Sequence, residues 1–176
     1  ICVRLVGSEM CIRDSIEKTA AIQERVIKEV YAACATAGVL LEGTLLKPSM
    51  TVCGAECPDQ ADYKKVAGYT IRTLLRSVPA AVAGINFLSG GLSEEAASIY
   101  LNEMNAAPDL PWNVSFSYGR ALQHSAIRAW GGSDIEAGQK FIIARAKANS
   151  EASIGCYVAD SQPSSDEKLF VAGYSY

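Results

Sequence analysis

The sequence is poor in the side chains that most often bind catalytic metals, since its 176 residues include a single histidine, His124. A catalytic zinc ion usually takes three protein ligands, most often histidines. Cys53 and Cys57 could join His124 in a site, but Pro58 follows directly and there is no second cysteine pair, which favours two ordinary loop thiols. His124 lies in a helical stretch without a nucleophile elbow, which disfavours a Ser-His-Asp hydrolase. We therefore expect no metal site.

Long apolar runs and clusters of positive charge are also missing. No stretch approaches the roughly 20 apolar residues of a membrane span, so we expect no membrane partner. The 16 Lys and Arg residues against 19 Asp and Glu give a net charge of −3. Without a basic run, nucleic acid is not an expected partner. With 49% hydrophobic and 20% charged residues, the composition is typical of a soluble globular protein with a buried core.

Cysteine is too scarce for a disulfide-stabilised scaffold. The cysteines are scattered through apolar segments, which indicates reduced thiols and a cytoplasmic protein. They are Cys2, Cys11, Cys34, Cys53, Cys57 and Cys156.

Glycine, proline and the spacing of apolar residues divide the chain into alternating helices and strands. The first expected helix is 17–37, with Ile22, Val26, Val30 and Cys34 on its apolar face. The next begins at Pro58 and stops before Pro79, and the third is capped by Ser93. The fourth follows Gly119-Arg120 and ends at Gly131, and the last begins with a capping box at 133–136 and continues to about Asn149. The expected strands are 39–46, 80–88 and 112–118.

This order of elements predicts an α/β fold with a parallel sheet. No GxGxxG follows any strand, which disfavours a dinucleotide-binding fold. Instead, each strand has polar residues at its carboxyl end, namely Lys47, Ser89-Gly90-Gly91 and Gly119-Arg120. That end is where the active sites of (β/α)8 TIM barrels lie, but a whole barrel has eight strands in about 250 residues. The three strands here therefore predict the C-terminal portion of such a barrel.

The ends of the chain do not fit this pattern. The chain begins with Ile1, and residues 1–6 are too short and wrongly flanked for a signal peptide. Residues 6–15 look like translated adapter or vector sequence. We therefore expect residues 1–15 to be a sequencing or vector artefact and residues 16–157 to form the barrel portion. Residues 158–176, where the chain turns polar, are expected to form a flexible tail.

Lys47 is the sharpest candidate for chemistry. At the end of a strand and before Pro48, its ammonium could be partly desolvated, and a neutral amine attacks a ketone to form a Schiff base. On pattern alone, a solvated loop lysine is the favoured interpretation. Glu42 lies at an odd offset from Lys47, so on a regular strand the two face opposite sides, and we assign Glu42 to packing or an outer polar contact.

The other two strand ends suggest an anion site. Ser89, Gly90 and the helix start that follows offer backbone N–H groups and a hydroxyl, although an ordinary glycine turn explains them equally well. Gly119 and Arg120 add a guanidinium suited to a phosphate, against the equal alternative of a surface arginine paired with a carboxylate. Ser117 shares strand parity with Gly119 and is expected on the same side.

Several segments resemble class I fructose-1,6-bisphosphate aldolases, in the family's order and from about Ile16 to the end of the chain. They are residues 41–50, 87–95, 116–123 and 129–132, together with the terminal Tyr176. The resemblance implies a (β/α)8 barrel that is usually a homotetramer. It implies cleavage of fructose 1,6-bisphosphate to dihydroxyacetone phosphate and glyceraldehyde 3-phosphate, without a metal or other cofactor.

The resemblance also implies roles for individual residues. Lys47 matches the lysine that forms the imine with the substrate ketone. The positions that match phosphate-binding residues are Ser89, Gly90, Gly119 and Arg120, with Ser117 lining the same pocket. Tyr176 matches the C-terminal tyrosine that assists protonation of the enamine carbon.

One departure from the family is serious. Its acid–base carboxylates and additional active-site lysines belong to earlier strands, which this sequence lacks, so we expect the 176-residue chain alone not to be a competent aldolase.

The alternative function is that of a catalytically inactive phosphosugar-binding or scaffold relative, although Lys47 is retained. A different phosphate-binding barrel would lack the Leu-Leu-Lys-Pro segment and the terminal tyrosine. Cytosol is the default compartment, with a plastid not excluded.

Overall fold

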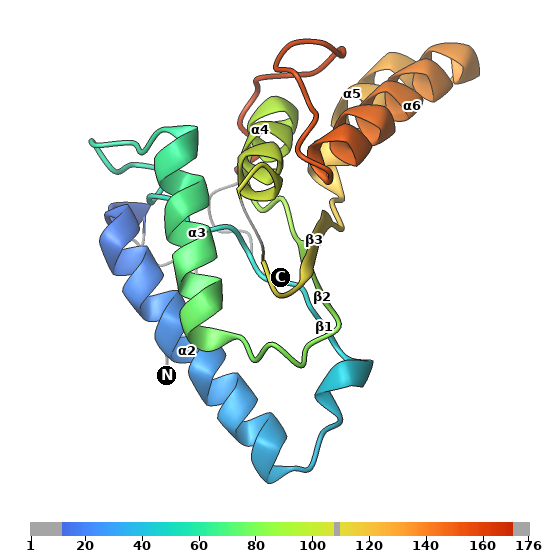
Figure 1. The fold of residues 1–176 in the computed structure, drawn as a ribbon. Coiled ribbons are helices and arrows are strands. Elements are labelled where there is room, and N and C mark those ends of the chain that lie inside the picture. Colours follow the sequence, from blue (N-terminus) through green and yellow to red (C-terminus); the bar gives the residue numbers. More distant parts are fainter. Residues whose placement is uncertain (1–11, 108–109, 171–176) are drawn as a thin grey trace.

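A computed structural model describes residues 12–107 and 110–170 and contains a three-stranded parallel sheet (Figure 1). The strands lie in the order β1-β2-β3, and β2 pairs with both neighbours. The strands are β1 (Leu45–Leu46), β2 (Gly84–Phe87) and β3 (Asn113–Phe116). The helices are α2 (Ile16–Thr36), α3 (Tyr63–Ser77), α4 (Glu94–Asn105), α5 (Arg120–Trp130) and α6 (Ile135–Ala152), with a 3-10 turn η1 (Leu41–Gly43). The expected alternation of helices and strands is confirmed.

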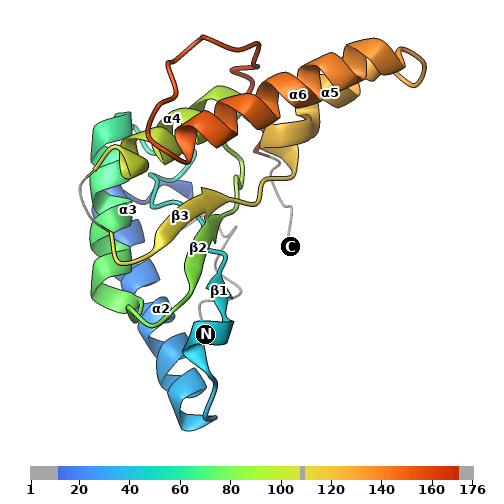
Figure 2. The ribbon, with the colours of Figure 1, turned by 45° about the vertical axis from the view of Figure 1, so that its right-hand side comes forward.

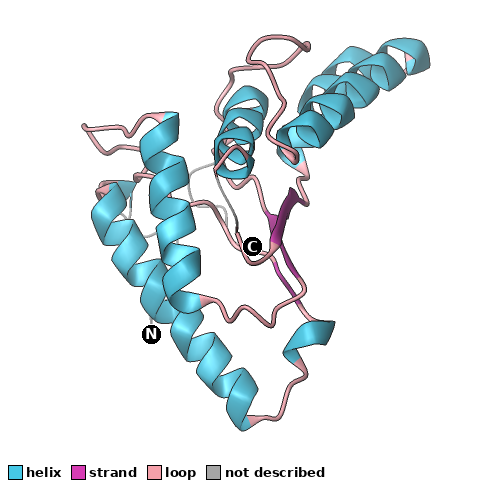
Figure 3. Cartoon of the chain, viewed as in Figure 1, coloured by secondary structure: helices cyan, strands magenta, loops and turns pink. Residues whose placement is uncertain are grey.

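Helices cover one side of this sheet. In Figures 1 and 3, α2 and α3 lie side by side on that side, and α4 packs between them and β3. The helices α5 and α6 pack along each other and project past the carboxyl end of β3, as Figure 2 shows. None of the helices in the described ranges combines the length and apolarity that a membrane span requires.

The core lies between the sheet and α3 and α4. Ile85 and Phe87 of β2 are fully buried on this side, against Leu101 and Met104 of α4, which are also fully buried. Because side chains alternate along a strand, the other face carries Leu45 of β1, which is 62% exposed. The sheet in the described chain is therefore a half-covered layer with open edges at β1 and β3, as expected for part of a barrel.

The expected apolar face of α2 is wrong in its middle, because Ile22 and Cys34 are partly buried but the two valines between them are not. Val26 and Val30 are exposed, whereas Ile16 and Ala20 are buried and Ile27 packs against the core. The helix carries apolar residues on more than one side, and its packing on α3 selects the side that is buried.

Two helix starts also differ from expectation. The second helix begins at Tyr63, not at Pro58, because the Asp62 carboxylate accepts a hydrogen bond from the Lys65 amide at 2.7 Å. The last helix is capped by Asp134 rather than by Ser133, and the Asp134 carboxylate accepts from the Ala137 amide at 2.9 Å.

The strands are shorter than expected. Residues 41–43 of the first one form η1, in which the Gly43 amide donates to the Leu40 carbonyl and the Thr44 amide to the Leu41 carbonyl. Residues 80–83 precede β2 as a turn and loop, and β3 ends at Phe116. The expectation for Glu42 rested on a regular strand, and that premise is wrong because Glu42 lies in η1.

Replacing Leu101 by alanine should destabilise the fold strongly. The side chain is fully buried, so truncation removes apolar burial and leaves a cavity, at a cost of about 2–5 kcal/mol. Leu75→Ala on α3 is the matched control, because Leu75 is 53% exposed and its truncation should change the free energy of unfolding by about 0.5 kcal/mol or less. Urea titration of both variants tests this, and equal effects would contradict the assigned core.

Candidate active site

The three candidate loops meet at the carboxyl edge of the sheet. The Leu88 amide donates to the Pro48 carbonyl at 3.0 Å, and Ser49 forms a parallel bridge with Leu88. On the other side of β2, the Ser117 amide donates to the Phe87 carbonyl at 2.8 Å. These contacts extend the sheet pairing beyond the strands, so the loops after β1, β2 and β3 lie next to one another.

Lys47 directly follows β1, and its side chain is exposed. The strand alternation that places Leu45 on the uncovered face places Lys47 there as well. The described residues of this chain therefore do not bury the Lys47 ammonium, and the partial desolvation considered from the sequence does not come from them.

The loop after Lys47 is held by side chains from two helices. Gln23 of α2 donates from Nε2 to Ser49 Oγ at 2.8 Å and accepts from Thr51 Oγ1 at 2.6 Å. The Thr51 amide donates to Thr70 Oγ1 of α3 at 2.9 Å. Sequence reasoning missed this set, because the two partners of Gln23 are 26 and 28 residues away along the chain.

Arg120 connects the loops after β2 and β3. Its Nη2 donates to the Gly90 carbonyl at 2.6 Å and its Nη1 to the Leu169 carbonyl at 2.5 Å. Gly90 has a φ of 57°, a left-handed conformation that favours glycine, and the neighbouring Ser89 is buried. Gly119 is the N-cap residue of α5, and its carbonyl accepts from the amides of residues 122 and 123.

These candidate residues thus lie at one edge of the sheet, but they differ in how far they are buried. Ser89 is buried, Arg120 is half-buried, and Ser117, Gly119 and Lys47 are exposed. Tyr176, the remaining candidate, lies outside the described residues.

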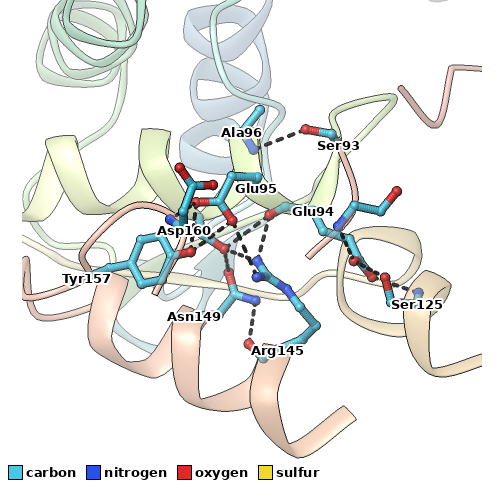
Figure 4. A network of polar contacts seen from close by, with 11 residues as sticks. Ser93, Glu94, Glu95, Ala96, Ser125, Arg145, Asn149, Tyr157 and Asp160 are labelled. Atoms are coloured by element: carbon cyan, nitrogen blue, oxygen red, sulfur yellow. Dashed lines mark hydrogen bonds and ion pairs between the residues drawn. The ribbon is translucent and has the colours of Figure 1, made fainter. Parts of the chain in front are cut away.

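A buried polar network surrounds the start of α4, the helix that follows the loop after β2 (Figure 4). Glu94, at the start of α4, accepts hydrogen bonds from the Ser125 amide at 2.9 Å, from Ser125 Oγ at 2.5 Å and from the Ser165 amide at 3.0 Å. Its side chain therefore joins α4 to α5 and to the C-terminal segment. Ser93 caps the same helix by accepting from the Ala96 amide, as expected.

Glu95, the next residue, is the centre of the second half of the network. Its carboxylate accepts hydrogen bonds from the Tyr157 hydroxyl at 2.8 Å and the Asp160 amide at 3.0 Å, and lies 3.6 Å from Nη1 of Arg145. Burial by itself would raise the pKa of Glu95, but these hydrogen bonds and the positive charge of Arg145 outweigh it and lower the pKa. Burial, with the contact to Glu95, raises the pKa of Tyr157 to about 12.

Arg145 of α6 is fully buried. Its Nη2 donates to the Glu94 carbonyl at 2.8 Å and to Ser98 Oγ at 2.5 Å. Asn149 donates to the Arg145 carbonyl and accepts from Ser98. Glu94 and Glu95 directly follow the expected Ser93 cap, and that capping signal did not indicate that both carboxylates are buried.

The residues considered for metal binding have other partners. Cys53 and Cys57 both donate towards the Asp59 carbonyl, at 3.4 and 3.6 Å, and Nε2 of His124 lies 3.3 Å from the Glu167 carboxylate. Over the described ranges, no group of three or more His, Cys, Asp or Glu side chains is arranged to hold a metal ion.

Residues 12–15 contact the body of the described chain. The Gly54 amide donates to the Asp14 carbonyl at 2.9 Å and the Glu56 amide to the Ile12 carbonyl at 2.9 Å, while Ser15 caps α2. The assignment of residues 1–15 to adapter sequence, and of 158–176 to a flexible tail, remains a prediction.

The parallel sheet, its helices on one side and the polar loops at its carboxyl edge define part of an α/β barrel. The profile of the family described as fructose-bisphosphate aldolase class-I matches residues 3–176. The chain therefore belongs to the class I fructose-bisphosphate aldolase family.

Individual relatives agree with this assignment. The chain is 47% identical over 164 residues to the chloroplastic fructose-bisphosphate aldolase 1 of Arabidopsis thaliana, with 92% of this chain and 41% of the relative covered. It is 45% identical over 181 aligned positions to the cytosolic aldolase 4 of the same plant, with 99% and 46% covered. A solved aldolase from Plasmodium falciparum superposes with a TM-score of 0.81 at 44% identity, covering 83% of this chain and 43% of that one. The chain thus spans about half the length of these relatives.

Removing the buried charge of Arg145 should unfold the network. Arg145→Met leaves the Glu95 carboxylate buried without its cation, at an expected cost of about 3–5 kcal/mol. Lys147→Met is the matched control on the same helix, because its ion pair with Glu151 is solvent-exposed and should contribute under about 1 kcal/mol. Thermal and urea unfolding measure the stability of both variants. A loss of stability in Arg145→Met no larger than that of the control would contradict a structural role for Arg145.

The raised pKa of Tyr157 predicts a loss of stability at alkaline pH. A tyrosine in the unfolded chain ionises near pH 10, whereas Tyr157 in the fold keeps its proton up to about pH 12. Between these values the folded state binds more protons than the unfolded state, so the free energy of unfolding falls as the pH rises. Tyr157→Phe removes this proton and should flatten the decline, as measured by urea titrations from pH 9 to 12. An equally steep decline in the variant would contradict the assignment.

Proposed function

We propose that this chain supplies the Schiff-base lysine and a substrate-phosphate site of a class I fructose-bisphosphate aldolase. The observation that carries the proposal is the meeting of the loops after β1, β2 and β3, which brings Lys47 and the residues Ser89, Gly90 and Arg120 to the same edge of a parallel sheet. In (β/α) barrels this edge is where the reaction occurs. Membership of the aldolase family supports the choice of reaction.

In this proposal the Lys47 amine attacks the ketone carbon of fructose 1,6-bisphosphate and water leaves, which forms an imine. A general base takes the proton of the C4 hydroxyl, the C3–C4 bond breaks, and its electron pair passes to the protonated imine. Glyceraldehyde 3-phosphate departs and an enamine remains on Lys47. Protonation of the enamine carbon, assisted by Tyr176, and hydrolysis of the imine then release dihydroxyacetone phosphate. No metal or other cofactor takes part.

Arg120, Gly90, Ser89, Gly119 and Ser117 hold a substrate phosphate in this scheme. A guanidinium can hold a phosphate through two parallel N–H groups, and the backbone at Gly90 adopts a left-handed conformation that lets an anion approach closely. Binding the phosphate fixes the position of the ketone relative to Lys47, which lowers the entropic part of the barrier to attack.

The proposal extends to the complete protein. We propose a homotetramer in the cytosol, on the basis of the family resemblance and of cytosolic relatives such as aldolase 4 of Arabidopsis. Chloroplastic relatives are equally similar, so fractionation of cells that express the full-length protein tests the compartment. Light scattering of the same protein tests the tetramer.

Borohydride trapping with dihydroxyacetone phosphate tests the role of Lys47. Reduction should attach the ligand to Lys47, identified by peptide mass analysis, and Lys47→Met should abolish labelling. Lys64→Met is the matched control, because Lys64 is exposed on α3 and is not one of the candidate site residues, and it should leave labelling unchanged. The same pair is tested in a protein extended to the full length of the relatives, where Lys47→Met should reduce kcat by at least about 1,000-fold, the order of loss typical for a catalytic nucleophile. Undiminished labelling in Lys47→Met would refute the assignment.

A further inference from the structure

Two cysteines in the loop between β1 and α3 share one hydrogen-bond acceptor. The Cys53 thiol donates to the Asp59 carbonyl oxygen at 3.4 Å, and the Cys57 thiol donates to the same oxygen at 3.6 Å. Because both sulfurs contact a single atom, they also lie close to each other. Both cysteines are free thiols in the structure.

A tight turn of the backbone brings the two cysteines together. The Cys57 amide donates to the Gly54 carbonyl at 3.0 Å, which closes a β-turn directly after Cys53. A disulfide requires two Cα atoms about 4.4–6.8 Å apart, and a β-turn keeps its ends within about 7 Å. Gln60 Nε2 donates to the carbonyls of Gly54 and Cys57, both at 2.9 Å. Gln60 therefore holds the turn without using either thiol.

The pair lies close to the surface of the molecule. Each cysteine is 8% exposed, and the two pack with Ile16 and Val66 in a small apolar cluster. Their neighbours in the loop, residues 55, 56 and 58–60, are exposed. A small neutral oxidant such as hydrogen peroxide can reach thiols in such a loop, whereas a bulky oxidant such as glutathione disulfide reaches them less readily.

One further contact distinguishes the two sulfurs. The Ala61 amide donates to Cys53 Sγ at 3.3 Å. The species that attacks an oxidant is the thiolate, and an amide already directed at the sulfur can donate to its negative charge. This contact favours Cys53 as the sulfur that reacts first and Cys57 as the one that reacts second.

We propose that Cys53 and Cys57 are a redox-active pair that hydrogen peroxide converts into an intramolecular disulfide. The Cys53 thiolate attacks one oxygen of the peroxide, the O–O bond breaks and hydroxide leaves, which gives a sulfenic acid on Cys53. The Cys57 thiolate attacks that sulfur, the S–S bond forms and the hydroxyl group leaves as a second hydroxide. The two thiol protons convert both hydroxides to water, so the sulfurs are oxidised and the peroxide is reduced.

Oxidation changes the contacts at the end of this loop. The Asp59 carbonyl loses both S–H donors, and the Ala61 amide loses its thiol acceptor. These residues directly precede Asp62, the N-cap of α3, so the disulfide loosens the entry into that helix. In a reducing compartment such a bridge is transient and responds to the oxidant level. The inference does not depend on the reaction proposed for Lys47.

Peptide mass analysis of the whole chain after treatment with hydrogen peroxide tests the pair. The fragment that contains both cysteines should lose two hydrogens and regain them with dithiothreitol. Cys53→Ser should abolish this change, whereas Cys57→Ser should stop the reaction at a sulfenic acid on Cys53 that dimedone traps. Cys34→Ser is the matched control, because Cys34 lies on α2 and outside this loop, and it should leave the disulfide unchanged. Urea titration checks that each variant keeps the fold.

Hydrogen exchange gives an independent readout in the unaltered chain. Oxidation should speed exchange of the Ala61 amide by about twofold to tenfold, the range that the loss of one weak hydrogen bond produces. The Thr51 amide, which donates to Thr70 Oγ1, should be unaffected.

Two results would overturn the proposal. One is the absence of a bridge between Cys53 and Cys57 at peroxide concentrations that oxidise the exposed Cys156. The other is a bridge from either residue to a different cysteine in its place. Sulfenic acid on Cys57 in Cys53→Ser, formed as fast as on Cys53 in Cys57→Ser, would overturn the assigned order of attack.

Discussion

Two adjacent buried carboxylates, Glu94 and Glu95, are the constraint on which the rest of the structure depends. A buried charge is tolerated only when hydrogen bonds or an opposite charge replace the lost water. Here the replacements come from three other parts of the chain, namely Ser125 of α5, Arg145 of α6 and the C-terminal segment. The start of α4 therefore cannot keep its conformation unless these elements dock on it.

This requirement positions the candidate site. Glu94 directly follows the loop that holds Ser89 and Gly90. Ser125 lies in the first half of α5, the helix that begins at Arg120 directly after Gly119. Joining Glu94 to Ser125 holds the two loops at a constant separation, while the Gln23 contacts hold the loop after Lys47. Side chains that do not themselves face the uncovered side of the sheet thus hold the loops of the candidate site in place. Such supporting contacts are what preorganises a site.

Sequence reasoning succeeded where the signal was local. The Ser93 cap, the end of α5 at Gly131 and the parallel order of the strands were all predicted, and Gly131 has the left-handed φ of 51° that such an end requires. It failed where two local signals competed. Asp62 rather than Pro58 marks the start of α3, and Asp134 rather than Ser133 caps α6. In each case the acidic side chain accepts a hydrogen bond from the backbone amide three residues later. The apolar stripe of α2 failed for another reason, since the partner helix decides which side is buried.

The sequence by itself determined the order of elements, most ends of the helices and the family, because capping, glycine conformations and motif residues act over a few neighbouring positions. Only the tertiary structure decided what surrounds the site. Arg145 and Glu94 are 51 residues apart, and Arg120 and Leu169 are 49 apart. No periodicity encodes such pairs, because the free energy that brings them together comes from burying their helices against a common sheet and from satisfying charges that this burial removes from water.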